Sequence, residues 1–113
     1  MTLGAAAFPI LPGKTDDWRR FIAELNGSRR AEYVANRKAL GVHERSFLQP
    51  TPMGDMVVIT LEGDDPAGVF TKFAAMTDPF STWFLAQVKE VHGFDLRDAA
   101  AGPMPALVVD SAP

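Results

Sequence analysis

The sequence predicts a single α+β domain, residues 1–113, with strands and paired helices in the order β, αα, β, β, αα, β. Two long segments carry apolar side chains at spacings of three and four, which is typical of amphipathic helices. A central run of strand-forming residues follows a turn rich in Pro and Gly. A chain of this length, with 47% hydrophobic and 22% charged residues, is expected to bury a core without metal or disulfide support.

The first strand and the first pair of helices occupy residues 5–40. Residues 5–11 are apolar, and Pro9 indicates that this strand lies at a sheet edge or contains a bulge. Thr15 is expected to cap a helix that ends at Gly27 and has one apolar face. Ser28 is expected to cap a second helix over residues 29–40. Its weak apolar content predicts a position at the surface or over an opening.

Two further strands are predicted over residues 42–49 and 56–62, joined by turn residues 50–55. In residues 56–62 both alternating sets of side chains are largely apolar. We therefore expect helices to cover one face of the sheet and something else to cover the other face.

The second pair of helices is predicted from a repeated start signal, Asp65-Pro66 and Asp78-Pro79, in which Asp caps the helix and Pro occupies its first position. The longer helix is expected to end at His92-Gly93. Residues 94–105 read as a long connection, and residues 106–110 read as a last strand. This order is that of a ferredoxin-like βαββαβ sandwich with paired helices in each crossover.

The chain resembles the dimeric α+β barrel superfamily and, more narrowly, a small bacterial family of uncharacterised proteins. The segments that carry the resemblance cover most of the chain: Pro12-Gly13-Lys14, Arg29-Arg30-Ala31-Glu32-Tyr33, Glu44-Arg45-Ser46-Phe47-Leu48-Gln49, Thr51-Pro52-Met53-Gly54-Asp55, Asp78-Pro79-Phe80, Trp83-Phe84 and Val91-His92-Gly93. The resemblance implies a homodimer in which two sheets face each other to form a barrel. It implies no particular activity, because members of the wider superfamily perform different chemistries on one fold.

Composition excludes several kinds of site. The absence of cysteine excludes disulfides, thiolate metal sites and a cysteine nucleophile. Two histidines far apart in the sequence offer no metal-ligand spacing, so we expect neither a metal nor another cofactor. A haem held axially by His92 or His43 is a distant alternative.

Charge and hydropathy bear on partners and location. The net charge is −3, although basic residues concentrate between residues 14 and 45, where they could attract an anionic ligand. A nucleic-acid partner would call for a basic total and a denser basic stripe, so none is expected. No apolar run is long enough to span a bilayer, and the N-terminal stretch is a poor signal peptide. We therefore expect no membrane partner and a cytoplasmic location.

The strand over residues 42–49 supplies the first candidate site residues. Alternation places His43, Arg45, Phe47 and Gln49 on one face and Glu44, Ser46 and Leu48 on the other. One interpretation is a pocket between sheet and helices, in which Arg45 binds an anionic or carbonyl group and Glu44 or His43 acts as acid or base. Gln49 could supply a hydrogen-bond donor to the ligand together with Tyr33 and Arg37. The alternative places His43 and Glu44 in solvent and pairs Arg45 with a neighbouring acid.

The helices supply the remaining candidates. Tyr33 and Arg37 are four residues apart, so they share a helix face and could bind a ligand or form a surface contact. Trp83 could form a pocket wall or belong to the core. His92 could act as a general base or could interact with the carbonyls at the end of its helix.

Three functions are consistent with these residues. The first is a small-molecule-binding homodimer, which could be a cofactor-independent enzyme acting on an anionic or oxygenated organic substrate. In it Glu44 and His92 are catalytic, and Tyr33, Arg37, Arg45, Gln49 and Trp83 bind the ligand. The second is a non-catalytic interaction or assembly module, and the third, more distant, is a haem-handling protein. The sequence leaves open whether the protein is an enzyme.

Overall fold

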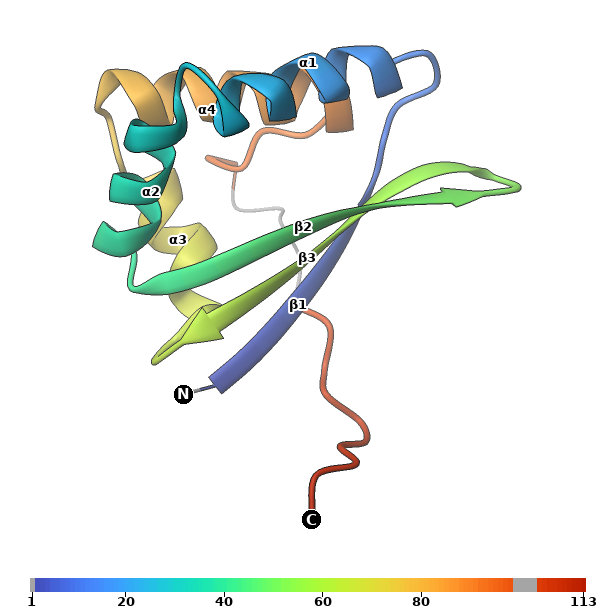
Figure 1. Cartoon of the computed structure of the whole chain (residues 1–113), viewed down its shortest axis with the longest axis vertical. Helices are drawn as coiled ribbons and strands as arrows, with labels where there is room; N and C mark the ends of the chain where they lie inside the picture. Colours follow the sequence, from blue (N-terminus) through green and yellow to red (C-terminus); the bar gives the residue numbers. More distant parts are fainter. Residues whose placement is uncertain (1, 99–103) are drawn as a thin grey trace.

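The computed structural model describes residues 2–98 and 104–113, in which three strands form one antiparallel sheet. The strands are β1 (Thr2–Pro9), β2 (Val42–Thr51) and β3 (Gly54–Gly63), and β3 lies between the other two. All the helices lie on one face of this sheet (Figure 1). The structure is therefore α+β, as the sequence predicts.

The β2–β3 hairpin fixes which side chains face the helices. Its ladder runs from Val42 opposite Gly63 to Thr51 opposite Gly54. Gly54 has a φ of 122°, a backbone conformation that other residues rarely adopt, and it follows the two-residue turn at Pro52 and Met53. Because side chains alternate along a strand, this register commits one set to the core and the other set to the opposite face.

Two pairs of helices cover the sheet. The first pair is α1 (Thr15–Asn26) and α2 (Arg30–Ala39), and the second crossover contains η1 (Pro66–Gly68), α3 (Val69–Ala74) and α4 (Pro79–His92). The two Asp-Pro start signals are confirmed, since the Asp65 side chain accepts from the Gly68 N–H and the Asp78 side chain accepts from the Ser81 N–H. Gly93 ends α4 in the left-handed conformation.

Two predicted helix caps are wrong. The residues before α1 and α2 are Lys14 and Arg29, and neither helix has a side-chain cap. Thr15 begins α1, and its hydroxyl hydrogen bonds to Asp55 Oδ2 at 2.7 Å. Ser28 lies in the turn between the helices, because the N–H groups of Gly27 and Arg29 already bind the carbonyl of Glu24. Thr15 therefore makes a tertiary contact and Ser28 lies in a turn, where the sequence predicted that each would cap a helix.

Aromatic side chains dominate the core between the sheet and the helices. Phe84 of α4 packs edge-to-face on Phe21 of α1 and Phe73 of α3, with ring centroids 4.9 and 5.1 Å apart. The sheet contributes Val57, Ile59 and Leu61, the set of β3 side chains that alternation placed together. Burial of this apolar surface is the main force that holds the helices on the sheet.

The predicted fourth strand is absent from the residues that the structure describes. Residues 106–110 have no strand pairing and are exposed. A strand sequence needs a neighbouring edge to supply its hydrogen bonds, and this segment lies beside none. Part of the predicted connection, residues 99–103, lies outside the described residues.

None of the helices in the described part of the chain lies on the second face of the sheet (Figure 1). Across its middle, Ala7 of β1, Val58 of β3 and Phe47 of β2 lie in one row, and Phe47 is 53% exposed. The next row, Pro9, Met56 and Gln49, is also largely apolar. We call this second face of the sheet the open face.

Among the described residues no helix is both long and apolar enough to cross a membrane.

Candidate functional site

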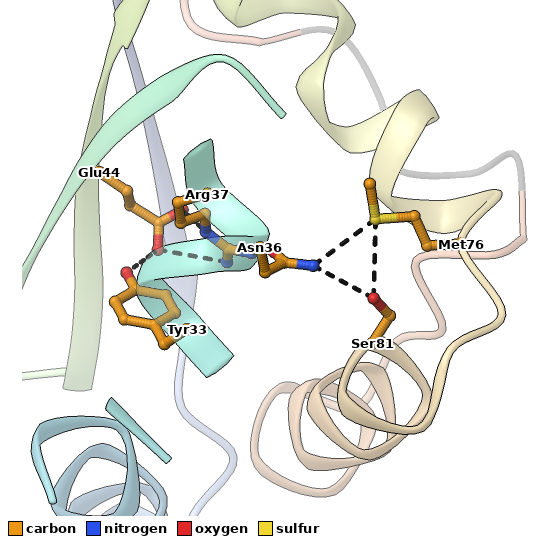
Figure 2. Close-up of polar contacts among 6 residues, drawn as sticks. All are labelled: Tyr33, Asn36, Arg37, Glu44, Met76 and Ser81. Atoms are coloured by element: carbon orange, nitrogen blue, oxygen red, sulfur yellow. Dashed lines mark hydrogen bonds and ion pairs between the residues drawn. The ribbon is translucent and has the colours of Figure 1, made fainter. Parts of the chain in front are cut away.

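The polar residues buried between sheet and helices centre on an ion pair between Arg37 of α2 and Glu44 of β2. The Nε atom of Arg37 lies 3.3 Å from Glu44 Oε2, and Nη2 lies 3.4 Å from Glu44 Oε1. The two side chains are only 8% and 7% exposed. Their i+7 separation spans the α2–β2 turn at Gly41, so a short connection brings both partners to the same place. Figure 2 shows the pair and its neighbours.

Aromatic rings surround the Arg37 guanidinium. It lies 4.6 Å from the ring centroids of both Phe73 and Phe84, and 5.0 Å from that of Tyr33. Faces of aromatic rings attract cations, so these rings offset part of the cost of removing the charge from water. The guanidinium is nevertheless incompletely hydrogen bonded: its Nε–H is buried, and the contact with Glu44 lacks hydrogen-bond alignment. Glu44 Oε2, at 3.3 Å, therefore compensates the charge at Nε without forming a hydrogen bond to it.

Tyr33 completes the polar group on the sheet side. Its hydroxyl donates to Glu44 Oε1 at 2.8 Å (Figure 2). Burial and the nearby Glu44 carboxylate raise the pKa of the Tyr33 hydroxyl well above its usual value. The phenol is therefore a permanent hydrogen-bond donor to Glu44 at neutral pH.

A second part of the network links α2 to the start of α4. Arg37 donates to the Asn36 side-chain oxygen, and the Asn36 amide donates to Ser81 Oγ at 3.2 Å. Ser81 in turn donates to Asp78 Oδ1 at 2.7 Å. Figure 2 shows Asn36 directed toward Ser81 and the Met76 sulfur. Sequence reasoning missed Asn36 and Ser81; the only available signal for Ser81 was its position three residues after the Asp78 cap.

The Arg37–Glu44 pair separates two spaces. On the outside is a cleft of about 530 Å³ between α2 and the β2–β3 end of the sheet, and both residues line it together with Tyr33. On the inside is a cavity of about 70 Å³ between sheet and helices, and both residues line that as well. Water occupies roughly 30 Å³ per molecule in the liquid, so the cavity has room for about two waters or a small functional group.

His92 lines the same interior cavity from the end of α4. Its Nδ1 lies 2.8 Å from the carbonyl oxygen of Pro9, which only accepts, so Nδ1 carries the proton. Burial lowers the pKa of His92, so the ring is neutral at pH 7 and its Nε2 is a proton acceptor. The remaining walls are mostly aromatic and aliphatic, among them Phe8, Phe70 and Phe94.

The structure brings together only some of the predicted site residues. Glu44, Arg37 and His92 share the cavity, and Tyr33 lies in the adjoining cleft. Arg45 and Gln49 are on the open face, where Arg45 pairs with Glu62 and the Gln49 amide donates to the carbonyl of Pro50. The structure therefore does not bring them together with Arg37, because both lie an odd number of residues from Glu44 in β2 and point to the opposite side of the sheet.

Trp83 lines neither space. It packs against Phe21 and Phe80, and the Arg29 guanidinium lies 4.0 Å from its ring centroid. Of its two predicted roles, the structure shows the packing role. His43 is exposed near the start of β2, where it lines the outer cleft and not the interior cavity. No group of three or more His, Cys, Asp or Glu side chains suited to a metal occurs among residues 2–98 and 104–113.

Comparison with known proteins adds no assignment. No protein-family model, curated protein or solved structure matches the chain.

Proposed function

We propose that the protein binds a small oxygenated organic molecule between sheet and helices and acts on it by proton transfer, without a cofactor. One observation carries the proposal: Glu44, Arg37 and His92, from β2, α2 and α4, line one apolar-walled cavity. A mostly apolar pocket with a few convergent polar groups is the usual form of a small-molecule site. In this site His92 Nε2 takes a proton from the substrate, and the positive charge of the Arg37 guanidinium stabilises the negative charge that develops on the substrate oxygen.

The buried carboxylate favours a neutral ligand over an anion. Glu44 already supplies one negative charge beside Arg37, and a second anion would meet that charge in a poorly solvated space. A carbonyl or hydroxyl oxygen would accept from Arg37 without this repulsion. The size of the cavity restricts the enclosed part to a small head group, and the rest of a larger substrate would extend into the cleft.

Acetone and acetate provide a matched pair of probes, because they have the same number of non-hydrogen atoms and nearly the same shape. We expect amide chemical shifts around the cavity to move with acetone in the millimolar range. Acetate should bind at least ten-fold more weakly. In Glu44→Gln the preference should disappear, because Arg37 is then free to pair with the acetate carboxylate. Glu90→Gln is the control, since it removes the same charge from an exposed ion pair with Lys14 and Glu90 lines neither the cavity nor the cleft.

Two results would count against this site. One is an unchanged preference in Glu44→Gln; the other is shifts that map to the open face instead of the cavity. A haem is not expected there, because a porphyrin is far larger than the 70 Å³ cavity. If neither probe binds, the alternative of a non-catalytic assembly module is favoured.

The open face supports a homodimer whether or not the cavity binds a ligand. Its exposed apolar surface, with Phe47 at the centre, is suited to cover the same surface of a second copy, as in a dimeric α+β barrel. Sedimentation at micromolar concentration should show a dimer, and Phe47→Asp should shift it to monomer. Val34→Asp, which changes an exposed valine on α2, should leave the protein dimeric. A wild-type protein that remains monomeric would refute the dimer.

A further inference from the structure

The C-terminal residues form an exposed apolar segment with the composition of a strand. Leu107, Val108 and Val109 are 69%, 89% and 80% exposed. Valine and leucine in such a run favour extended structure, but the backbone groups then need a neighbouring edge to bond with. Apolar side chains on both sides of a strand are typical of strands that are covered on both faces.

Within residues 2–98 and 104–113 no strand pairs with the outer edge of β1 or of β2, and the two edges differ in how they are protected against a further strand. The outer edge of β2 carries His43, Glu44 and Arg45 and contains Pro50, all features that discourage a further strand. The outer edge of β1 has no charged residue from Thr2 to Phe8, and only its last residue is proline. The β1 edge is therefore the one that is open to another strand.

The segment does not pair with that edge in its own chain, and its position does not suit an antiparallel pairing there. Met104 and Pro105 lie beside Thr2, Leu3 and Gly4, at the starting end of β1. An antiparallel neighbour of β1 has to arrive at the Pro9 end and run toward Thr2. Residues 106–113 instead begin where such a strand would finish, and Figure 1 shows them running away from the sheet.

We propose that residues 106–110 of each chain add as an antiparallel strand to the β1 edge of a second copy. The inference rests on the homodimer proposed above. Each copy supplies one free strand and one free edge, so a two-fold axis satisfies both at once and closes the assembly. Each exchanged strand extends the sheet of the second copy. In that position Val108 is covered on one face of the sheet, and Leu107 and Val109 are covered on the other face.

Mixed labelling tests the exchange without assuming a register. Dimers formed from one ¹³C,¹⁵N-labelled chain and one unlabelled chain should show isotope-filtered NOEs between the 107–109 methyl groups and the backbone of residues 2–9. These NOEs have to join different chains. NOEs only within one chain, or none in a dimeric sample, would overturn the exchange while leaving the dimer through the open face intact.

A pair of valine substitutions gives an independent readout. Val108→Lys should raise the dimer dissociation constant at least ten-fold, because it places a charge in the covered strand. Val34→Lys makes the same change at the exposed valine on α2 and should leave the constant within two-fold. Equal effects of the two substitutions would overturn the exchange. A monomeric wild-type protein would overturn both the exchange and the proposed dimer.

Discussion

Replacing Glu44 with Gln tests how much the buried ion pair contributes to the free energy of unfolding. The substitution keeps the shape and an oxygen that accepts from the Tyr33 hydroxyl, but it removes the only carboxylate within ion-pair distance of Arg37 among the described residues. Breaking a buried pair by removing one partner typically costs about 3–5 kcal/mol. The three aromatic rings and Asn36 still contact the guanidinium. We therefore expect a loss at or just below the bottom of this range, about 2–3 kcal/mol of unfolding free energy.

Urea denaturation measures this loss. For a domain of this size, with a slope of roughly 1–1.5 kcal/mol per M, the midpoint should fall by about 2 M at an unchanged slope. Glu62→Gln is the matched control, because Glu62 pairs with Arg45 at the surface, where water screens the interaction. The urea midpoint of Glu62→Gln should change far less than that of Glu44→Gln. Equal midpoints for the two variants, at equal slopes, would refute the idea that the Arg37–Glu44 pair is energetically distinct.

Three further predictions concern single groups. Because burial lowers the pKa of His92, the unfolded chain takes up its proton at a higher pH than the folded chain does. The unfolding free energy should therefore fall as pH drops below about 6.5, and His92→Gln should reduce this dependence on pH. Because the pKa of Tyr33 is raised, the unfolding free energy should decline as pH rises above about 10. Tyr33→Phe should make that decline shallower and should cost about 1 kcal/mol at pH 7, both measured by urea denaturation. Asp78→Ala should destabilise the protein by about 1 kcal/mol in the same assay through loss of the α4 cap.

The parts of the fold that the sequence predicted are those controlled by neighbouring residues. The Asp-Pro signals at Asp65 and Asp78 marked helix starts because the capping partners lie three residues away. The same logic failed for Thr15, where a distant side chain, Asp55, competes for the hydroxyl. It also failed for residues 106–110, because strand formation depends on a partner that local sequence does not specify.

In the candidate site too, the sequence predicted what depends on neighbouring residues and did not predict what depends on distant ones. The spacing of Tyr33 and Arg37 placed them together because a helix has a fixed period. Alternation separated Glu44 from Arg45 correctly, but it could not say which of the two faces the helices. That choice is made by the β2–β3 register, which sends Val57, Ile59 and Leu61 into the core and Glu44 with them.

The position of Glu44 links stability to ligand choice. Its carboxylate compensates the buried Arg37 charge, and the same negative charge disfavours an anionic ligand in the cavity. Glu44→Gln should therefore destabilise the fold and at the same time strengthen acetate binding. A purely structural pair would give the first effect without the second, whereas general loosening of the core would weaken both probes together. The opposite signs of the two effects are thus what distinguishes a binding site from a structural ion pair.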